Sequence, residues 1–387
     1  MRALLLLLTV LALPASAQLT MEEALERFFT EEPQAEWFAP SFLAQVPIEQ
    51  IGPVRQQVTG SLGAFDRAEG SGGRWMAYFE KGRVPVQASL DAEGRFVGLF
   101  LRPPVPLAGS LDDVLESFDA LPGEGHLLVR VDDEARLDHR ADEPFAVGSA
   151  FKLVVLKALK DAIDAGERSW ADVVEYSDDD RGLETGTLRR WPAGAPITLH
   201  TLATLMIAQS DNEATDALIR VLGREAVEAA DPSGRNRPFL TTAEAFKLKD
   251  PDNAPLLARW REGDESARRE ITLELTLLEV PGASIFAAGE PVATDVEWFL
   301  TANELCDLIA EVAEVDLLGV NPGVVEARDF DRVAYKGGSE PGVLNMTTWT
   351  EDDGRSVCVC ATKNADTAIS TSDLAGVVGS AFEVVEE

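Results

Sequence analysis

The chain has 387 residues, and 45% of them are hydrophobic, which is enough for two domains with well-formed cores. It carries 67 Asp and Glu residues against 34 Lys and Arg residues, a formal net charge of −33. Nucleic acid and anionic membrane surfaces repel so acidic a protein, so we predict that it binds neither. The acidic residues are spread along the chain, which indicates a solvated surface rather than a site.

Residues 1–17 are typical of an export signal. Arg2 precedes an apolar stretch over residues 4–13, and Ala15-Ser16-Ala17 is a small-residue cleavage site. The apolar stretch is too short to serve as a stable membrane anchor. We therefore expect a protein without stable membrane insertion that is exported to the periplasm or out of the cell.

Residues 18–102 predict a small α+β accessory domain. Thr20 to Glu23 form a capping-box pattern that opens an amphipathic helix. Three strand-like stretches follow near residues 74–80, 83–90 and 95–102, with turn residues between them. A helix followed by an antiparallel meander is similar to the small cystatin-like or NTF2-like domains that precede some exported hydrolases, and we expect a packing or partner-binding role.

A proline-rich linker is predicted over residues 103–109, because consecutive prolines favour an extended chain. The second domain is expected over residues 110–387. It begins with a helix and a strand near residues 126–131, and it ends with two antiparallel strands and a helix over about residues 367–385.

The second domain contains a serine three residues before a lysine at the start of an apolar helix. Ser149 and Lys152 lie on one face of such a helix, so their side chains can meet. A buried lysine loses basicity, and its neutral amine can take the proton of a serine hydroxyl. By itself the pattern is equally typical of a capping serine and a lysine at the edge of a core.

Two further short motifs follow in the same domain. Ser210-Asp211-Asn212 comes directly after an apolar helix over residues 199–208, and Lys336-Gly337-Gly338-Ser339 lies in a strand-like context. The ordered set S-x-x-K, S-D-N and K-G-G resembles the penicillin-recognising serine enzymes, which are the class A β-lactamases and the penicillin-binding proteins. The resemblance covers about residues 110–387 and implies an antiparallel sheet flanked by helices.

An acyl transfer needs a nucleophile, a base, a proton path to the leaving group and donors for the oxyanion. We assign Ser149 as the nucleophile, Lys152 as its base or proton relay, and Ser210 as the carrier of the proton to the leaving amine. Lys336 is expected to attract a substrate carboxylate and to keep the site electropositive.

Substrate binding is predicted for the other motif residues. Asn212 offers an amide to the Lys152 region and to the substrate, and Gly337 and Gly338 leave room for a substrate along the strand edge. The resemblance implies that the backbone N–H groups of Ser149 and Ser339 form the oxyanion hole.

The sequence departs from the family pattern in two places. Gly337 stands where the family usually has threonine or serine, whose hydroxyl helps to bind the substrate carboxylate. Carboxylate binding is therefore weakened unless Ser339 or an arginine such as Arg332 supplies another hydrogen-bond donor. The glutamate and asparagine pair that orients the deacylating water in class A enzymes is not found between residues 223 and 249. Acylation is therefore better supported than rapid turnover.

The leading hypothesis is a serine hydrolase that opens a β-lactam or related cyclic amide through a Ser149 acyl-enzyme, with no metal or organic cofactor. A peptidase acting on D-Ala-D-Ala-type peptides or an esterase is the first alternative. A slowly deacylating covalent sensor or trap is the alternative outside catalysis. The oligomeric state is left open.

The histidines and cysteines point to no other mechanism. There is no G-x-S-x-G motif for a Ser-His-Asp hydrolase. Cys358 and Cys360 lie two apart in a predicted strand and cannot easily bridge each other. A bond from Cys306 to either of them stays open.

Overall fold

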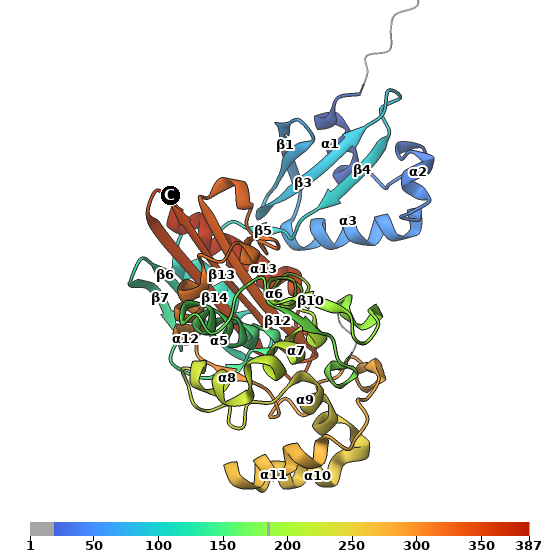
Figure 1. Ribbon diagram of the computed structural model, residues 1–387. Helices are drawn as coiled ribbons and strands as arrows, with labels where there is room; N and C mark the ends of the chain where they lie inside the picture. The colour runs from blue at the N-terminus through green and yellow to red at the C-terminus, as the bar shows by residue number, and fades with distance from the viewer. Residues whose placement is uncertain (1–18, 184–185, 387) are drawn as a thin grey trace, which may run out of the picture. The chain divides into compact units, whose positions relative to one another are not determined.

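The computed structural model describes residues 19–183 and 186–386, so the predicted export signal lies outside it (Figure 1). The chain separates into two compact units, Met1–Leu107 and Ala108–Glu387. In the described residues, no helix is both long and apolar enough to cross a membrane.

The first unit is a layer of helices against an antiparallel sheet. Its elements are α1 (Met21–Thr30), η1 (Ala35–Trp37), α2 (Pro40–Leu43), α3 (Ile48–Leu62), β1 (Phe65–Ser71), β2 (Arg74–Phe79), β3 (Gly82–Leu90), β4 (Phe96–Leu101) and β5 (Val105–Pro106). The sheet order is β1-β2-β3-β4, and β5 pairs with β3. The Thr20–Glu23 capping box is present, and Phe28 and Phe29 of α1 are buried against the sheet.

Three features of this unit differ from the sequence-based expectation. α3 was not predicted, since Gly52, Pro53 and Gly60 weaken its helical pattern. β1 was not predicted because its sequence is largely polar and lacks an apolar alternation, in keeping with the single buried residue of the strand. Residues 105–106, predicted as linker, instead form β5.

The second unit contains most of the helices and the larger sheet. Its helices are α4 (Leu111–Asp119), η2 (Gly148–Phe151), α5 (Lys152–Asp164), η3 (Asp178–Asp180), η4 (Leu188–Arg190), α6 (Leu199–Ala208), α7 (Asn212–Leu222), α8 (Arg224–Ala230), α9 (Thr242–Lys249), η5 (Pro251–Asn253), α10 (Ala254–Glu262), α11 (Glu265–Leu275), η6 (Ala283–Phe286), α12 (Ala302–Val312), η7 (Asp316–Gly319), η8 (Ala327–Asp329) and α13 (Thr371–Glu386). Its strands are β6 (Glu124–Val131), β7 (Glu134–His139), β8 (Phe145–Ala146), β9 (Val173–Glu175), β10 (Pro196–Thr198), β11 (Phe299–Leu300), β12 (Arg332–Glu340), β13 (Val343–Asp352) and β14 (Arg355–Asn364).

The main sheet of this unit is antiparallel, with the order β12-β13-β14-β6-β7, so β12 is an edge strand. Side chains alternate between its faces. On one face, Val357 and Val359 of β14 pack with α4 and α13, and on the other, Cys358 and Cys360 pack with the helical core around α5. The predicted antiparallel sheet flanked by helices is thus confirmed.

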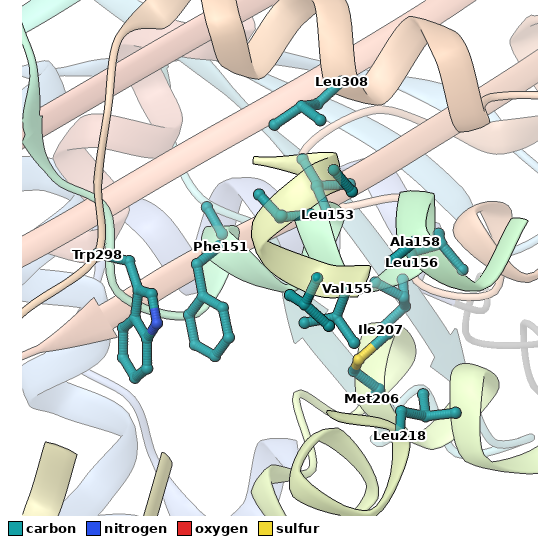
Figure 2. Packing of buried hydrophobic residues seen from close by; sticks show 14 of the residues in the cluster. Phe151, Leu153, Val155, Leu156, Ala158, Met206, Ile207, Leu218, Trp298 and Leu308 are labelled. Atoms are coloured by element: carbon teal, nitrogen blue, oxygen red, sulfur yellow. The ribbon is translucent and has the colours of Figure 1, made fainter. Parts of the chain in front are cut away.

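Helix α5 is central to the larger of these two cores. Figure 2 shows Leu153, Val155 and Leu156 of α5 among side chains from α6, α7 and α12. Residues 152–156 of the helix are all buried because protein surrounds its first turn and a half. This packing holds the start of α5, and the serine before it, in a fixed place.

A disulfide joins Cys306 of α12 to Cys358 of β14. The sequence left open whether Cys306 bonds to Cys358 or to Cys360, and the structure shows that it bonds to Cys358. Cys360 points to the same face of β14 as Cys358, as predicted, and stays a buried free thiol. The bond links a helix to the sheet across the larger core.

We predict that alkylation of the denatured, unreduced protein modifies one cysteine per chain and that prior reduction raises this to three. The double variant Cys306→Ser/Cys358→Ser should lower the melting temperature by roughly 5–10 °C, since closing a loop of this length restricts the unfolded chain. Mass spectrometry and calorimetry check both values. Three reactive thiols before reduction would contradict the pairing.

Candidate active site

Ser149 lies in the short 3-10 helix η2, which leads without a break into α5. Gly148 has a φ of +48°, a left-handed conformation that glycine adopts readily. The ring of Phe151 stacks on Trp298 with centroids 3.7 Å apart, and the Val147 N–H donates to the Trp298 carbonyl at 3.0 Å. These contacts hold Ser149, which is half-buried, at the wall of a cavity.

Lys152 opens α5 and is fully buried. Its Nζ donates to the Ser210 carbonyl oxygen at 2.6 Å, to Asn212 Oδ1 at 2.8 Å and to Ser210 Oγ at 3.3 Å. Among the described residues, Ser149 is not a hydrogen-bond partner of this amine, although the helical spacing predicted their meeting. The amine is turned toward the S-D-N segment because the acceptors that compensate for its burial lie there.

The S-D-N segment is a tight link between α6 and α7. Ser210 has a φ of +56°, which points its backbone carbonyl and its hydroxyl at Lys152. Asp211 caps α7: its Oδ1 accepts from the N–H groups of Glu213 and Ala214, and its Oδ2 accepts from those of Thr187 and Leu188. The middle residue of the motif thus secures the loop that positions its two neighbours.

Lys336 approaches the same hydroxyl from the edge strand β12. Its side chain is buried, and its Nζ donates to Ser210 Oγ at 3.1 Å and to the carbonyl of Gly337. Burial lowers the pKa of Lys336 to about 7. Burial and the positive charge of Lys336 lower the pKa of Lys152 well below its ordinary value, against the opposing charges of Asp216 and Asp211. At neutral pH the site is consequently less electropositive than the sequence suggested.

Gly338, which lines the cavity, is also needed for packing against the Ser149 turn. A Cβ on this residue would lie 2.0 Å from the Val147 carbonyl oxygen and 2.5 Å from the Ser149 nitrogen. A Cβ on Gly148 would lie 3.1 Å from the Ser339 nitrogen. The structure therefore brings the backbone nitrogens of Ser149 and Ser339 close together, as the resemblance implies for an oxyanion hole. The predicted role of Gly338 in substrate binding stays a prediction.

The space beside Gly337 is taken by a tyrosine that the sequence analysis did not single out. A Cβ on Gly337 would lie 2.4 Å from the hydroxyl of Tyr335, two residues earlier on the same face of β12. Burial raises the pKa of Tyr335 to about 12, so its hydroxyl keeps its proton. Arg332, considered from sequence as a compensating group, is exposed and lies 3.7 Å from Glu351. The only sequence signal that Tyr335 could supply the hydroxyl missing at Gly337 is their spacing of two residues in a predicted strand, which places both on one face.

One cavity of about 520 Å³ brings the motifs together. All the residues predicted from the motifs line it except Lys152, which lies behind its wall. Aromatic side chains of Phe246, Phe286 and Trp298 cover another part of the wall. The combination of a few convergent polar groups with apolar walls is typical of a small-molecule site.

Two glutamates in the stretch between residues 223 and 249 have structural roles. Glu228 accepts from Arg269 and from the N–H of Phe239, and Glu244 pairs with Arg224. Neither is among the residues that line the cavity. The acids that do line the described cavity are Glu297 and Glu340, which lie far along the chain from Ser149.

The described residues include no group of three or more His, Cys, Asp or Glu side chains placed to hold a metal ion. His126 is buried between the Glu143 carbonyl and the Thr362 hydroxyl, and burial lowers its pKa to about 4. This histidine has a structural role in the sheet.

Comparison with known proteins gives a match of residues 106–231 to the sequence model of the β-lactamase enzyme family. This confirms the predicted resemblance over a stretch that contains Ser149, Lys152, Ser210 and Asn212, and it ends before Lys336. No curated protein is similar enough to count as a relative by sequence.

Three solved structures illustrate what this chain is similar to. A β-lactamase from Sphaerobacter thermophilus is 21% identical, covers 72% of this chain and 95% of its own, and has a TM-score of 0.49. An ancestral class A β-lactamase of Gram-negative bacteria is 18% identical, with 71% and 98% covered and a TM-score of 0.48. The protein PBP-A is 15% identical, with 70% and 95% covered and a TM-score of 0.45.

We predict that Gly338→Ala disrupts the turn that carries Ser149, because the added Cβ overlaps backbone atoms that cannot rotate away. The melting temperature should fall by several degrees, and labelling of Ser149 by a serine-reactive fluorophosphonate should slow at least tenfold. Gly282→Ala is the matched control, since its Cβ would meet only the Ser284 hydroxyl at 3.7 Å. Equal behaviour of the two variants would contradict this account.

Proposed function

From the family match and the geometry of the cavity, we propose that the protein is an exported serine hydrolase that opens a β-lactam or related cyclic amide through an acyl-enzyme on Ser149. The observation that carries the proposal is the convergence of two buried lysines, Lys152 and Lys336, on the hydroxyl of Ser210 beside Ser149. Such a set supplies a nucleophile, a base and a proton path in one place.

Acylation follows from these contacts. Burial and the charge of Lys336 lower the pKa of Lys152 well below its ordinary value, which favours the neutral amine that can accept the Ser149 proton as the hydroxyl attacks the carbonyl carbon. The adjacent backbone N–H groups of Ser149 and Ser339 stabilise the oxyanion. Ser210, which contacts both lysines, passes a proton to the leaving nitrogen, and Asn212 holds Lys152 through Oδ1.

Substrate carboxylate recognition rests on the edge of β12. Lys336 supplies a positive charge, and Tyr335 supplies the hydroxyl that residue 337 lacks. In the described part of the chain the Tyr335 hydroxyl makes no hydrogen bond, so it is free to donate to a ligand.

Export is supported by two features. The leader pattern of residues 1–17 has the expected order of charge, apolar stretch and cleavage site. The Cys306–Cys358 disulfide is of the kind that forms and persists in oxidising compartments such as the periplasm.

The proposal predicts a colour change with a chromogenic cephalosporin and a transient mass gain of one acyl group on the wild-type protein. Ser149→Ala should show neither, because it lacks the nucleophile. Time-resolved intact mass and absorbance measure both. A lasting single adduct without turnover would identify a covalent sensor or a penicillin-binding protein instead, and no adduct at all would refute the β-lactam proposal.

Tyr335→Phe should raise KM for a carboxylate-bearing β-lactam by about tenfold or more while kcat changes little, since one hydrogen bond to a charged group contributes about 1.5–3 kcal/mol. The effect should vanish with the methyl ester of the same substrate. Tyr176→Phe is the control: the Tyr176 hydroxyl is buried without a partner in the described residues and lies outside the cavity. An equal KM change with the ester would exclude carboxylate recognition.

A further inference from the structure

A buried cluster of one lysine and two glutamates forms part of the cavity wall outside the motifs. Lys249, the last residue of α9, has a fully buried side chain whose Nζ donates to Glu297 and to Glu340, which lines the cavity at the end of β12. The side chains of Glu297 and Glu340 are 2% and 9% exposed. Glu297 Oε2 is buried with no hydrogen-bond partner in the described residues.

Both glutamates are tied to the turn that carries Ser149. Glu340 lies on the same face of β12 as Lys336 and Gly338. Gly338 abuts the Ser149 nitrogen, and Glu340 is two residues further along the strand, a backbone separation of about 6.6 Å. Glu297 precedes Trp298, which bonds Val147 and stacks on Phe151. Both glutamates therefore belong to segments that hold the Ser149 turn, and both line the same cavity as Ser149.

The charges of the cluster favour one retained proton. Although burial opposes it, the two carboxylates raise the pKa of Lys249, so the lysine stays charged. Burial, the charge of Glu297 and a hydrogen bond with it raise the pKa of Glu340 to about 8, against the influence of Lys249. Asp295, the other acid near Lys249, is paired with Arg261. A general base works best when its pKa lies near the working pH.

We propose that Glu340 is the general base that hydrolyses the Ser149 acyl-enzyme, with Glu297 and Lys249 as positioning residues. This rests on the proposed acyl-enzyme. The Glu340 carboxylate takes a proton from a water molecule while the water oxygen bonds to the acyl carbon. The bond from that carbon to Ser149 Oγ then breaks, and Glu340 returns the proton to Ser149 Oγ as the acid leaves.

The test measures acylation and release separately by intact mass, with a cephalosporin, a penicillin and a thioester as acyl donors. Glu340→Gln should acylate within threefold of the wild-type rate and release the acyl group at least ~100-fold more slowly. Glu228→Gln, a buried and paired glutamate outside the cavity, is the matched control and should release at the wild-type rate.

The pH dependence distinguishes a base from a structural contact. Glu340 must be ionised to act, so wild-type release should fall about tenfold per pH unit below pH 8 and reach a plateau above it. Glu340→Gln should lose this dependence. Glu297→Gln removes a negative charge beside Glu340, so it should move the midpoint of the release profile to lower pH.

The outcomes separate this inference from the proposed function. Unchanged release in Glu340→Gln, or a wild-type adduct that persists for hours, would overturn the base assignment and leave acylation standing. Absence of any wild-type adduct with all three donors would refute the proposed function and the base together. Slow acylation and slow release in equal measure would indicate a structural defect and also overturn the assignment.

Discussion

Two lysines buried without an ion-pair partner are the constraint on which the site depends. Among the described residues, Lys152 and Lys336 have only neutral hydrogen-bond acceptors, and burial lowers the pKa of both. A buried cation without a carboxylate is unfavourable, so each lysine is driven toward its neutral form. The S-D-N loop must therefore be held firmly, which explains why Asp211 makes four backbone hydrogen bonds.

A third buried lysine shows the opposite arrangement near the same cavity. Lys249 faces two carboxylates and keeps its charge, while Glu340 takes the raised pKa. One side of the cavity thus holds amines whose pKa is lowered, and another holds a carboxyl group whose pKa is raised. Groups whose surroundings move their pKa values in opposite directions can serve opposite steps of one reaction.

The larger core connects these two sides of the cavity. α5 packs among α6, α7 and α12 (Figure 2). The disulfide links α12 to β14, and Gly338 of β12 meets the Ser149 turn without room for a Cβ. Closely packed protein interiors have low compressibility, so they resist small displacements of their side chains. The relative positions of Ser149, Lys336 and Glu340 are consequently set by packing within the cavity wall and in the core behind it.

The sequence alone determined what local spacing can encode: the Ser149–Lys152 pair, the S-D-N and K-G-G motifs, the antiparallel sheet flanked by helices, and the helix and meander of the first unit. It could not show that Lys152 turns to Ser210 rather than to Ser149, since that depends on a loop placed by Asp211. Nor could it find Tyr335 in place of a residue-337 hydroxyl, or join Lys249 to Glu297 and Glu340. Motifs record neighbours along the chain, whereas the charge state of a buried group is decided by whatever the fold packs against it.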